Sequence, residues 1–199
     1  KIDDELGDKP VVRARLLTAI GSVYQNLGDI KGAEPILADA AKGPFASLGD
    51  EVTARMNYAD ALIRLRAFDK AAQEIETAAR LVDAAAPDLD VAALSFHLME
   101  IDRQRASMAF YQADFDRAIA TYLSAKEHCA KAPDCDPDTQ ASISNNLSVA
   151  YNDSGRADEA RKEMLTVRKI HAEKYGEDHL KTATADHNIA YTDFRRSDF

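Results

Sequence analysis

The stretch ARLLTAIGSVYQNLGDIKGAEPILADAAKGPF, residues 14–45, has large and small side chains at a characteristic set of spacings. With Ala14 as position 1, positions 4, 7, 8, 11, 15, 20, 24 and 27 are Leu17, Ile20, Gly21, Tyr24, Gly28, Ala33, Leu37 and Ala40. Small residues at positions 8, 20 and 27 let two helices approach closely, and large ones fill the space between neighbouring pairs. The stretch therefore predicts an antiparallel helical hairpin.

The same template fits four more times, which makes the hairpin a repeat. The further units start at Val52, Met99, Ala141 and Ala183, so the starts lie 38, 47, 42 and 42 residues apart. Position 7 of the third unit is Arg105, which departs from the template. We expect a single array over residues 1–199, with units at about 14–50, 52–90, 91–135, 138–178 and 180–199, the last one truncated at its position 17.

These positions resemble those of the tetratricopeptide repeat, and the resemblance covers nearly the whole chain. It implies an all-α fold, a right-handed α-α superhelix (a solenoid) of stacked antiparallel helical hairpins, with about nine helices. One hairpin cannot bury its apolar side alone, so its neighbours must cover it.

Narrower resemblances concern the kind of array. The spacing of 42 residues, with Asn145-Asn146-Leu147, Tyr151, Gly155-Arg156, Glu159-Ala160 and the run from Glu173 to His179, is similar to kinesin-light-chain-like repeats. The opening residues 2–8, with residues 12–17 and 33–35, resemble the C-terminal arrays of bacterial serine/threonine protein kinases and of some transcriptional regulators. The chain begins with Lys and ends inside a repeat, so we interpret it as a segment of a longer bacterial signalling protein. It contains no kinase motif.

Glycine followed by an acidic residue is expected to separate helices. Gly7-Asp8, Gly49-Asp50 and Gly176-Glu177 each predict the end of one helix and the start of the next. Residues 1–6 then form the end of an earlier helix. Longer connections are expected at residues 83–90 and 131–139, where Pro87 and Pro133 interrupt the pattern.

A ladder of side-chain amides predicts the binding surface. On the first helix of each hairpin, positions 2, 5, 6, 9, 12 and 13 point away from the stack and should line a concave groove. Position 6 is Ala19, Asn57, Gln104, Asn146 and Asn188. An amide both donates and accepts, so it suits the backbone of an extended peptide. The family resemblance agrees, because asparagine here contacts ligand backbone in several such domains. The alternative is a merely solvated face.

The predicted peptide-binding groove has thirteen residues: Asn57, Asp60, Arg64, Arg103, Gln104, Ser107, Tyr111, Asn145, Asn146, Asn152, His187, Asn188 and Tyr191. Arg15, Ser22, Gln25 and Met56 are expected beside them. Replacing Asn57, Asn146 and Asn188 by alanine should then weaken peptide binding with little effect on the melting temperature.

Composition and missing motifs exclude several functions. The net charge of −9 argues against a nucleic-acid partner, which requires a basic face. No apolar stretch approaches the ~20 residues of a membrane helix, so we expect no membrane contact by this segment. There is no glycine-rich phosphate loop, no Gly-x-Ser-x-Gly and no His-Glu-x-x-His. We therefore expect no enzymatic activity and no cofactor.

Cysteines and histidines invite other interpretations. Cys129 and Cys135, the only cysteines, could form a disulfide in an oxidising compartment, or stay a buried thiol and a loop thiol in the cytosol. A zinc site built on them lacks a second pair of ligands. We interpret the eight-residue spacing of His171, His179 and His187 as repeat register, and expect no metal.

The leading hypothesis is a non-catalytic module that binds a protein or an extended peptide, as the sensory or interaction region of a larger signalling protein. Self-association into a homo-oligomer is the alternative, and a small-molecule sensor is a third. Localisation stays open between the cytoplasm and the extracytoplasmic part of a bacterial membrane protein.

Overall fold

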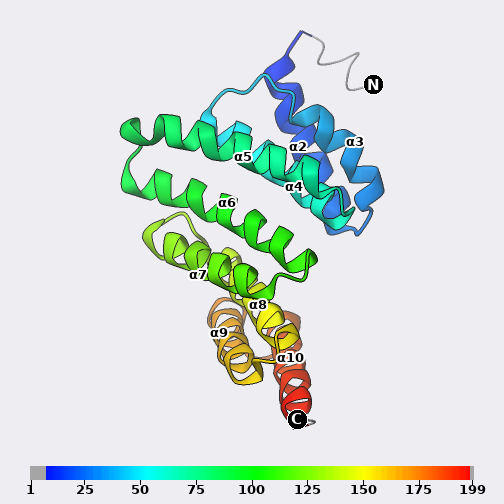
Figure 1. Cartoon of the computed structure of the whole chain (residues 1–199), viewed down its shortest axis with the longest axis vertical. Helices are drawn as coiled ribbons and strands as arrows, with labels where there is room; N and C mark the ends of the chain where they lie inside the picture. The colour runs from blue at the N-terminus through cyan, green and yellow to red at the C-terminus, as the bar shows by residue number, and fades with distance from the viewer. Residues whose placement is uncertain (1–7, 198–199) are drawn as a thin grey trace. The chain divides into compact units, whose positions relative to one another are not determined.

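A computed structural model describes residues 8–197 (Figure 1). Within this range all regular secondary structure is helical, with nine α-helices, α2 to α10, and one 3-10 turn, η1. This confirms the all-α prediction. None of the described helices is both long and apolar enough to cross a bilayer. The earlier helix expected at residues 1–6, Gly7 and the end of the fifth unit at Phe199 lie outside the described residues.

The chain forms two compact units, residues 1–90 and 91–199. The first unit contains two hairpins: α2 (Pro10–Asn26) with α3 (Ile30–Ala40), and α4 (Leu48–Arg64) with α5 (Phe68–Ala85), which continues into η1 (Ala86–Asp88). Gly21 of α2 is buried because Leu37 of α3 packs on its backbone, and a Cβ at residue 21 would lie 2.3 Å from Leu37 Cδ2. Leu37 also packs with Ala33 and with Ala61 of α4, so one leucine joins three helices.

The second unit contains α6 (Val91–Tyr111) with α7 (Phe115–Lys131), α8 (Pro137–Asp153) with α9 (Ala157–Tyr175), and α10 (Leu180–Ser197). Its core repeats the same scheme. Tyr122 of α7 packs with Leu147 and Ala150 of α8, while Met164 of α9 packs with Ala141 of α8 and Ala185 of α10. In this unit α7 and α9 therefore each fill the space between their own first helix and the next one.

The turn inside each described hairpin uses one backbone conformation. Position 15 has positive φ in all four: Gly28 (82°), Arg66 (60°), Ala113 (61°) and Gly155 (79°). The residue that follows donates its N–H to a carbonyl five residues earlier, as in Ala67 to Leu62 at 2.8 Å. This contact satisfies a carbonyl that the helix end leaves free. Two turns thus hold a side chain where the template has glycine.

The expected helix breaks are correct in part. Gly176 has φ 98° and ends α9, which confirms the prediction there. The prediction for Gly49 is wrong, because Ser47 caps α4 by accepting a hydrogen bond from the Asp50 N–H at 3.1 Å, which places Gly49 inside the first turn. The connection expected at residues 131–139 spans only 132–136, since Pro137 is the first residue of α8.

Candidate binding groove

A groove runs along α8, with α10 as its other wall and α9 behind it. Its larger part has a volume of about 280 Å³. Side chains at helical spacing on α8 and on α10 line it, with Met164 of α9 at the back. The lining residues are Asn145, Ser148, Val149, Asn152, Asp153, Met164, Asn188, Tyr191, Thr192 and Arg195. Four of them, Asn145, Asn152, Asn188 and Tyr191, belong to the predicted set.

A second hollow of about 250 Å³ shares Asn145 with the first and continues it toward the start of α8. Its lining is Asp138, Ala141, Ser142, Asn145, Val167, His171 and Lys181. We call the two together the α8–α10 groove.

Amide and hydroxyl groups connect the two walls. The Asn152 Nδ2 donates to Thr192 Oγ1 at 3.1 Å, and that hydroxyl donates to the Asn188 carbonyl at 3.0 Å. The Asn152 Oδ1 is buried and accepts no hydrogen bond from the described residues. Ser148 is used differently, since its hydroxyl donates to the Ala160 carbonyl of α9 at 2.9 Å. The Asn152 amide therefore has one polar atom left over at the groove.

Ion pairs join the helices at the end of the groove that is farther from the start of α8. Arg195 of α10 lies 3.1 Å from Asp153 of α8, and Arg161 of α9 lies 2.7 Å from Asp193 of α10. The charges that line or border the groove here are thus neutralised within the chain, which leaves amides, Tyr191 and apolar side chains for contact with a ligand.

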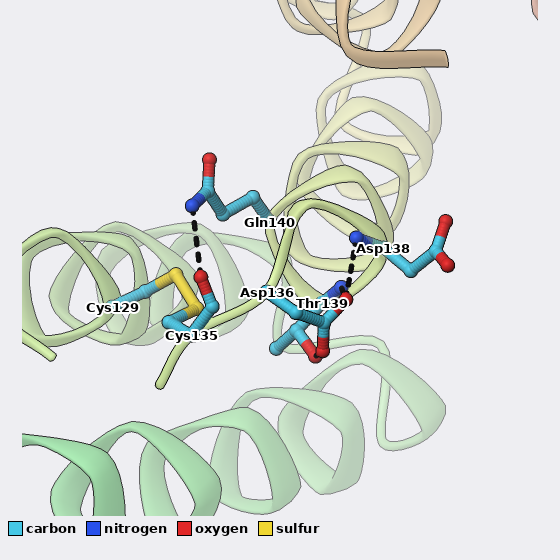
Figure 2. The surroundings of a disulfide bond; sticks show 6 residues. All are labelled: Cys129, Cys135, Asp136, Asp138, Thr139 and Gln140. Carbon is cyan, nitrogen blue, oxygen red and sulfur yellow. Dashed lines mark hydrogen bonds between the residues drawn. A yellow bond between two sulfur atoms is a disulfide. The ribbon is translucent and has the colours of Figure 1, made fainter. Parts of the chain in front are cut away.

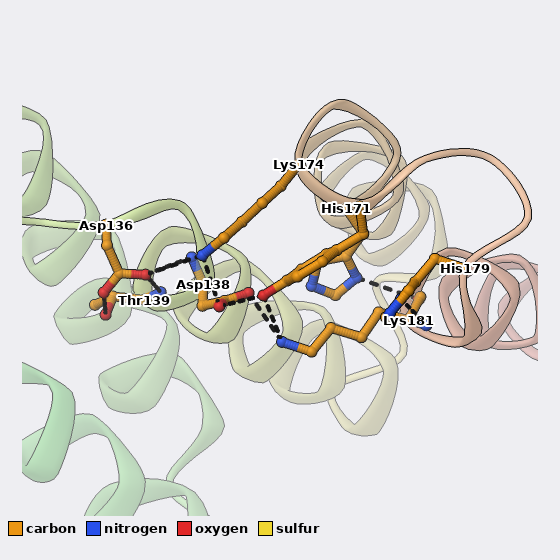
Figure 3. Close-up of polar contacts among 8 residues, drawn as sticks. Asp136, Asp138, Thr139, His171, Lys174, His179 and Lys181 are labelled. Atoms are coloured by element: carbon orange, nitrogen blue, oxygen red, sulfur yellow. Dashed lines mark hydrogen bonds and ion pairs between the residues drawn. The ribbon is translucent and has the colours of Figure 1, made fainter.

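A cluster around Asp138 holds the near end (Figure 3). Asp138, in the first turn of α8, accepts hydrogen bonds from Lys174 of α9 at 2.8 Å, from the Tyr175 hydroxyl, and from Lys181 of α10 at 3.0 Å. These donors, Lys174 first, hold the pKa of the Asp138 carboxyl well below its usual range. The bond to Asp138 raises the pKa of Lys174. The pKa of Lys181 is raised first by its hydrogen bond to the Tyr175 hydroxyl at 3.0 Å and then by its bond to Asp138. The Tyr175 ring also stacks on His179, with 4.7 Å between centroids.

A disulfide joins Cys129, at the end of α7, to Cys135 just before α8 (Figure 2). Both residues are 4% exposed, and the Gln140 Nε2 of α8 donates to the Cys135 carbonyl at 3.0 Å. Asp136 then caps α8 by accepting from the Asp138 N–H at 2.7 Å. The covalent link and the cap together fix where α8 begins, and Asp138 with it. Within the described residues no group of three potential ligands is arranged for a metal ion.

In the first unit the predicted residues bond to one another across α2 and α4. The Asn57 Nδ2 donates to Ser22 Oγ at 3.0 Å, and the Gln25 Nε2 donates to Asp60 at 2.8 Å. Arg64 lies 3.7 Å from Asp60. These side chains connect neighbouring first helices, a role that the helical wheel of a single hairpin does not reveal. Met56 is only 1% exposed, so its expected place in an open groove is wrong.

The remaining predicted residues lie away from the α8–α10 groove. On α6, Gln104 is 1% exposed, which contradicts an open position, and Arg103 pairs with Glu100 at 2.8 Å. Ser107 is half-buried and Tyr111 is exposed. Asn146 and His187 line neither hollow.

Several groove residues were missed by sequence reasoning, among them Asp138, Thr192 and Lys181. A signal for two contacts was present: Asp138 and Lys181 are 43 residues apart, and Asp153 and Arg195 are 42 apart. Opposite charges at the repeat distance indicate contacts between successive first helices.

The family profile described as tetratricopeptide repeat matches residues 14–42 and 139–199. These segments hold the hairpin α2–α3 and the helices α8 to α10 that form the groove. The chain contains tetratricopeptide repeats in these two segments. Domains of this family are protein-interaction scaffolds and are typically non-catalytic. The search of curated proteins finds no match.

Solved structures agree with the kinesin-light-chain-like form of the tetratricopeptide fold. A protein from Podosopora anserina, described as a kinesin light chain with nearly identical TPR-like repeats, has TM-score 0.63 and 17% identity, over 94% of this chain and 88% of that one. BtubC (BKLC) from P. vanneervenii has TM-score 0.69 and 20% identity, over 100% and 80%. A signal-transduction ATPase with a tetratricopeptide repeat sensor, from Pyrococcus horikoshii, has TM-score 0.70 and 16% identity, over 96% of this chain and 29% of that one.

Proposed function

We propose that this tetratricopeptide domain binds an extended segment of a partner protein in the α8–α10 groove. The observation that carries the proposal is the convergence of three amides, from Asn145, Asn152 and Asn188, on a hollow of about 280 Å³. The side chains of Asn145 and Asn188 can donate to and accept from a peptide backbone without regard to the ligand's sequence.

The groove also offers apolar contact. Val149 is 39% exposed on one wall, Tyr191 is 53% exposed on the other, and Met164 lies between them. An aromatic ring with a polar end is a frequent anchor in protein interfaces. Because Asp153 and Arg195 neutralise each other, binding at this end should depend on amide and apolar contacts and vary little with salt.

We further propose that the chain is the sensory or interaction region of a larger bacterial signalling protein. The output activity of that protein would belong to another of its domains. The sensor named in the Pyrococcus horikoshii protein supports the idea that such arrays serve signalling proteins, in a match that spans 29% of that chain. A kinase as the parent rests on the sequence resemblance of the first residues. That all five units form one array, with a ladder from Asn57 to Asn188, stays a prediction.

The test selects ligands without assuming their identity. A random peptide library displayed on phage is panned against the chain, and the affinity of selected peptides is measured by isothermal titration calorimetry. Asn188→Ala with Tyr191→Ala should weaken these peptides about tenfold or more, since truncating one anchor residue of an interface costs about 2 kcal/mol. His187→Ala, an exposed neighbour outside the hollow, is the matched control. If the wild type and the double variant bind the selected peptides with equal affinity, the groove is not the binding site.

A further inference from the structure

A hollow of about 170 Å³ lies between α7, α8 and α9, in the second unit. Two residues from each helix form most of its wall: Cys129 and Ala130 of α7, Ile143 and Ser144 of α8, and Thr166 and Ile170 of α9. We call it the Ser144 hollow. None of the described residues that line it also lines the α8–α10 groove, so the two are separate sites on different sides of α8.

The hollow lies where the other units of the repeat have a larger side chain. Ser144 is position 4 of the fourth unit, and the other units have Leu17, Arg55, Asp102 and Asp186 at this position. Leu17 is buried, and Arg55 extends to Glu74 of α5, 2.7 Å away. Serine is the smallest of the five side chains, so α8 leaves space next to it that the other first helices fill.

The preceding hairpin shows how the same place is closed. There, positions 4 and 26 are bonded directly, because the Ser124 hydroxyl of α7 donates to the Asp102 carboxylate of α6 at 2.6 Å. In the fourth unit these positions are Ser144 and Thr166, which both line the hollow. The Thr166 hydroxyl donates instead to the Lys162 carbonyl of its own helix at 3.2 Å. Two short side chains thus replace a direct bond by an open space between α8 and α9.

The hydroxyl of Ser144 is available to a bound molecule. This side chain is 1% exposed, and among the described residues its hydroxyl has no hydrogen-bond partner. A buried hydroxyl without a partner costs free energy, which a ligand that bonds to it recovers. The Thr166 oxygen, whose proton is already donated, can still accept a hydrogen bond. The hollow therefore favours a ligand that has a hydroxyl group of its own.

The rest of the wall favours a ligand that is apolar and uncharged. Ile143, Ile170 and Ala130 contribute aliphatic surface, and Cys129 contributes a disulfide sulfur, which does not ionise. Of the described residues that line the hollow, Lys126 alone is charged, and its ammonium lies 2.6 Å from the Glu163 carboxylate of α9. An anionic ligand would have to compete with Glu163 for this lysine.

The volume of the hollow sets the size of the ligand. A cavity of about 150 Å³ lined by aliphatic and aromatic side chains accepts a benzene ring. We propose that the Ser144 hollow binds a neutral molecule with one ring and one hydroxyl group, of the size of a phenol. The ring lies against Ile143 and Ile170, and the hydroxyl group bonds to Ser144. This site is independent of the peptide proposed for the α8–α10 groove.

The probes are para-fluorophenol and fluorobenzene, which have the same ring with and without the hydroxyl group. Each is titrated with the full chain and followed by fluorine NMR, and we expect saturable binding of both. Ser144→Ala keeps the space and removes the hydroxyl. It should weaken para-fluorophenol by about two- to tenfold, the effect of one neutral hydrogen bond, and leave fluorobenzene unchanged. An equal affinity of wild type and Ser144→Ala for para-fluorophenol would overturn the role of this hydroxyl.

Ser144→Leu fills the hollow with the side chain that the first unit has at position 4, Leu17. It should weaken both probes by at least about tenfold, because the space for the ring is lost. Thr184→Leu, at an exposed residue of α10 outside the hollow and the groove, is the matched control and should bind as wild type does. Circular dichroism verifies that the variants are folded.

Three results would overturn the proposal. The first is the absence of saturable binding to the wild type, which would mean that the hollow holds nothing larger than water. The second is unchanged binding to Ser144→Leu. The third is a loss of binding seen only in Asn188→Ala with Tyr191→Ala, which would place the ring in the α8–α10 groove.

Discussion

The Asp138 carboxylate lies 3.0 Å from the Lys181 ammonium, so the first turn of α8 is bonded directly to the first turn of α10. The two residues are 43 apart in sequence, close to the length of one repeat. This contact belongs to a cluster in which Lys174 and the Tyr175 hydroxyl share the same carboxylate. One side chain thus joins three helices at the near end of the groove.

Asp138→Asn should destabilise the chain at neutral pH, and the difference from wild type should shrink in acid. The pKa of Asp138 is lowered in the folded state, so its contribution is present above the unfolded pKa of about 3.9 and is lost as the pH falls below it. Urea unfolding of the variant and of the wild type measures the difference in stability at pH 7 and at pH 3. Asp134→Asn, in the exposed α7–α8 connection, is the control. A difference that persists unchanged at pH 3 would contradict the electrostatic explanation.

Arg66→Gly and Ala113→Gly should each raise the stability. Both residues have φ near 60°, where a side chain costs about 1 kcal/mol relative to glycine, partly offset by the greater freedom of glycine in the unfolded chain. We expect a net gain of up to about 1 kcal/mol in urea unfolding. Gly28→Ala and Gly155→Ala, at the same position of other hairpins, should lower the stability. A loss of stability in Arg66→Gly would show that its side chain outweighs the backbone term.

Reduction of the Cys129–Cys135 disulfide should destabilise the second unit by about 2 kcal/mol, the loop-closure value for so short a loop. Thermal melts with and without a phosphine reductant measure the change. The double variant Cys129→Ser, Cys135→Ser is the control, because its melting temperature should not respond to the reductant. Hydrogen exchange should locate the loss at residues 129–140, where Gln140 and Asp136 complete the connection.

Asn57→Ala should lower the stability by about 1 kcal/mol, since it removes a half-buried hydrogen bond to Ser22. The earlier expectation of an unchanged melting temperature assumed a solvated amide. Ser22→Ala should cost a similar amount, and the double variant should cost less than the sum of the two. Additive losses in this cycle would mean that the Asn57–Ser22 contact contributes nothing.

The hairpins were predictable because close helix packing leaves few choices at positions 8, 20 and 27. Gly21 and Leu37 illustrate this, since the glycine is required by the leucine that packs on it. The third unit forms α6 despite Arg105, which stays half-buried and lies 3.7 Å from Asp102 on the same helix. A polar departure at one position therefore does not prevent the helix.

The groove was only partly predictable, because a helical wheel places a side chain relative to its own helix and not to the next hairpin. Asn145, Asn152, Asn188 and Tyr191 do meet in one hollow. Gln104 was placed on the open face and is buried. Asn57 was assigned to a ligand, and its amide is bonded to Ser22.

Exposed ion pairs join α8 to α10 at the two ends of the groove, one between Asp138 and Lys181 and one between Asp153 and Arg195. At its middle, a neutral hydrogen bond from Asn152 to Thr192 connects the two helices. Exposed ion pairs weaken as ionic strength rises, and neutral hydrogen bonds do not. High salt should therefore weaken the contacts at the two ends of the groove before the one at its middle, while the amide and apolar contacts available to a ligand change little.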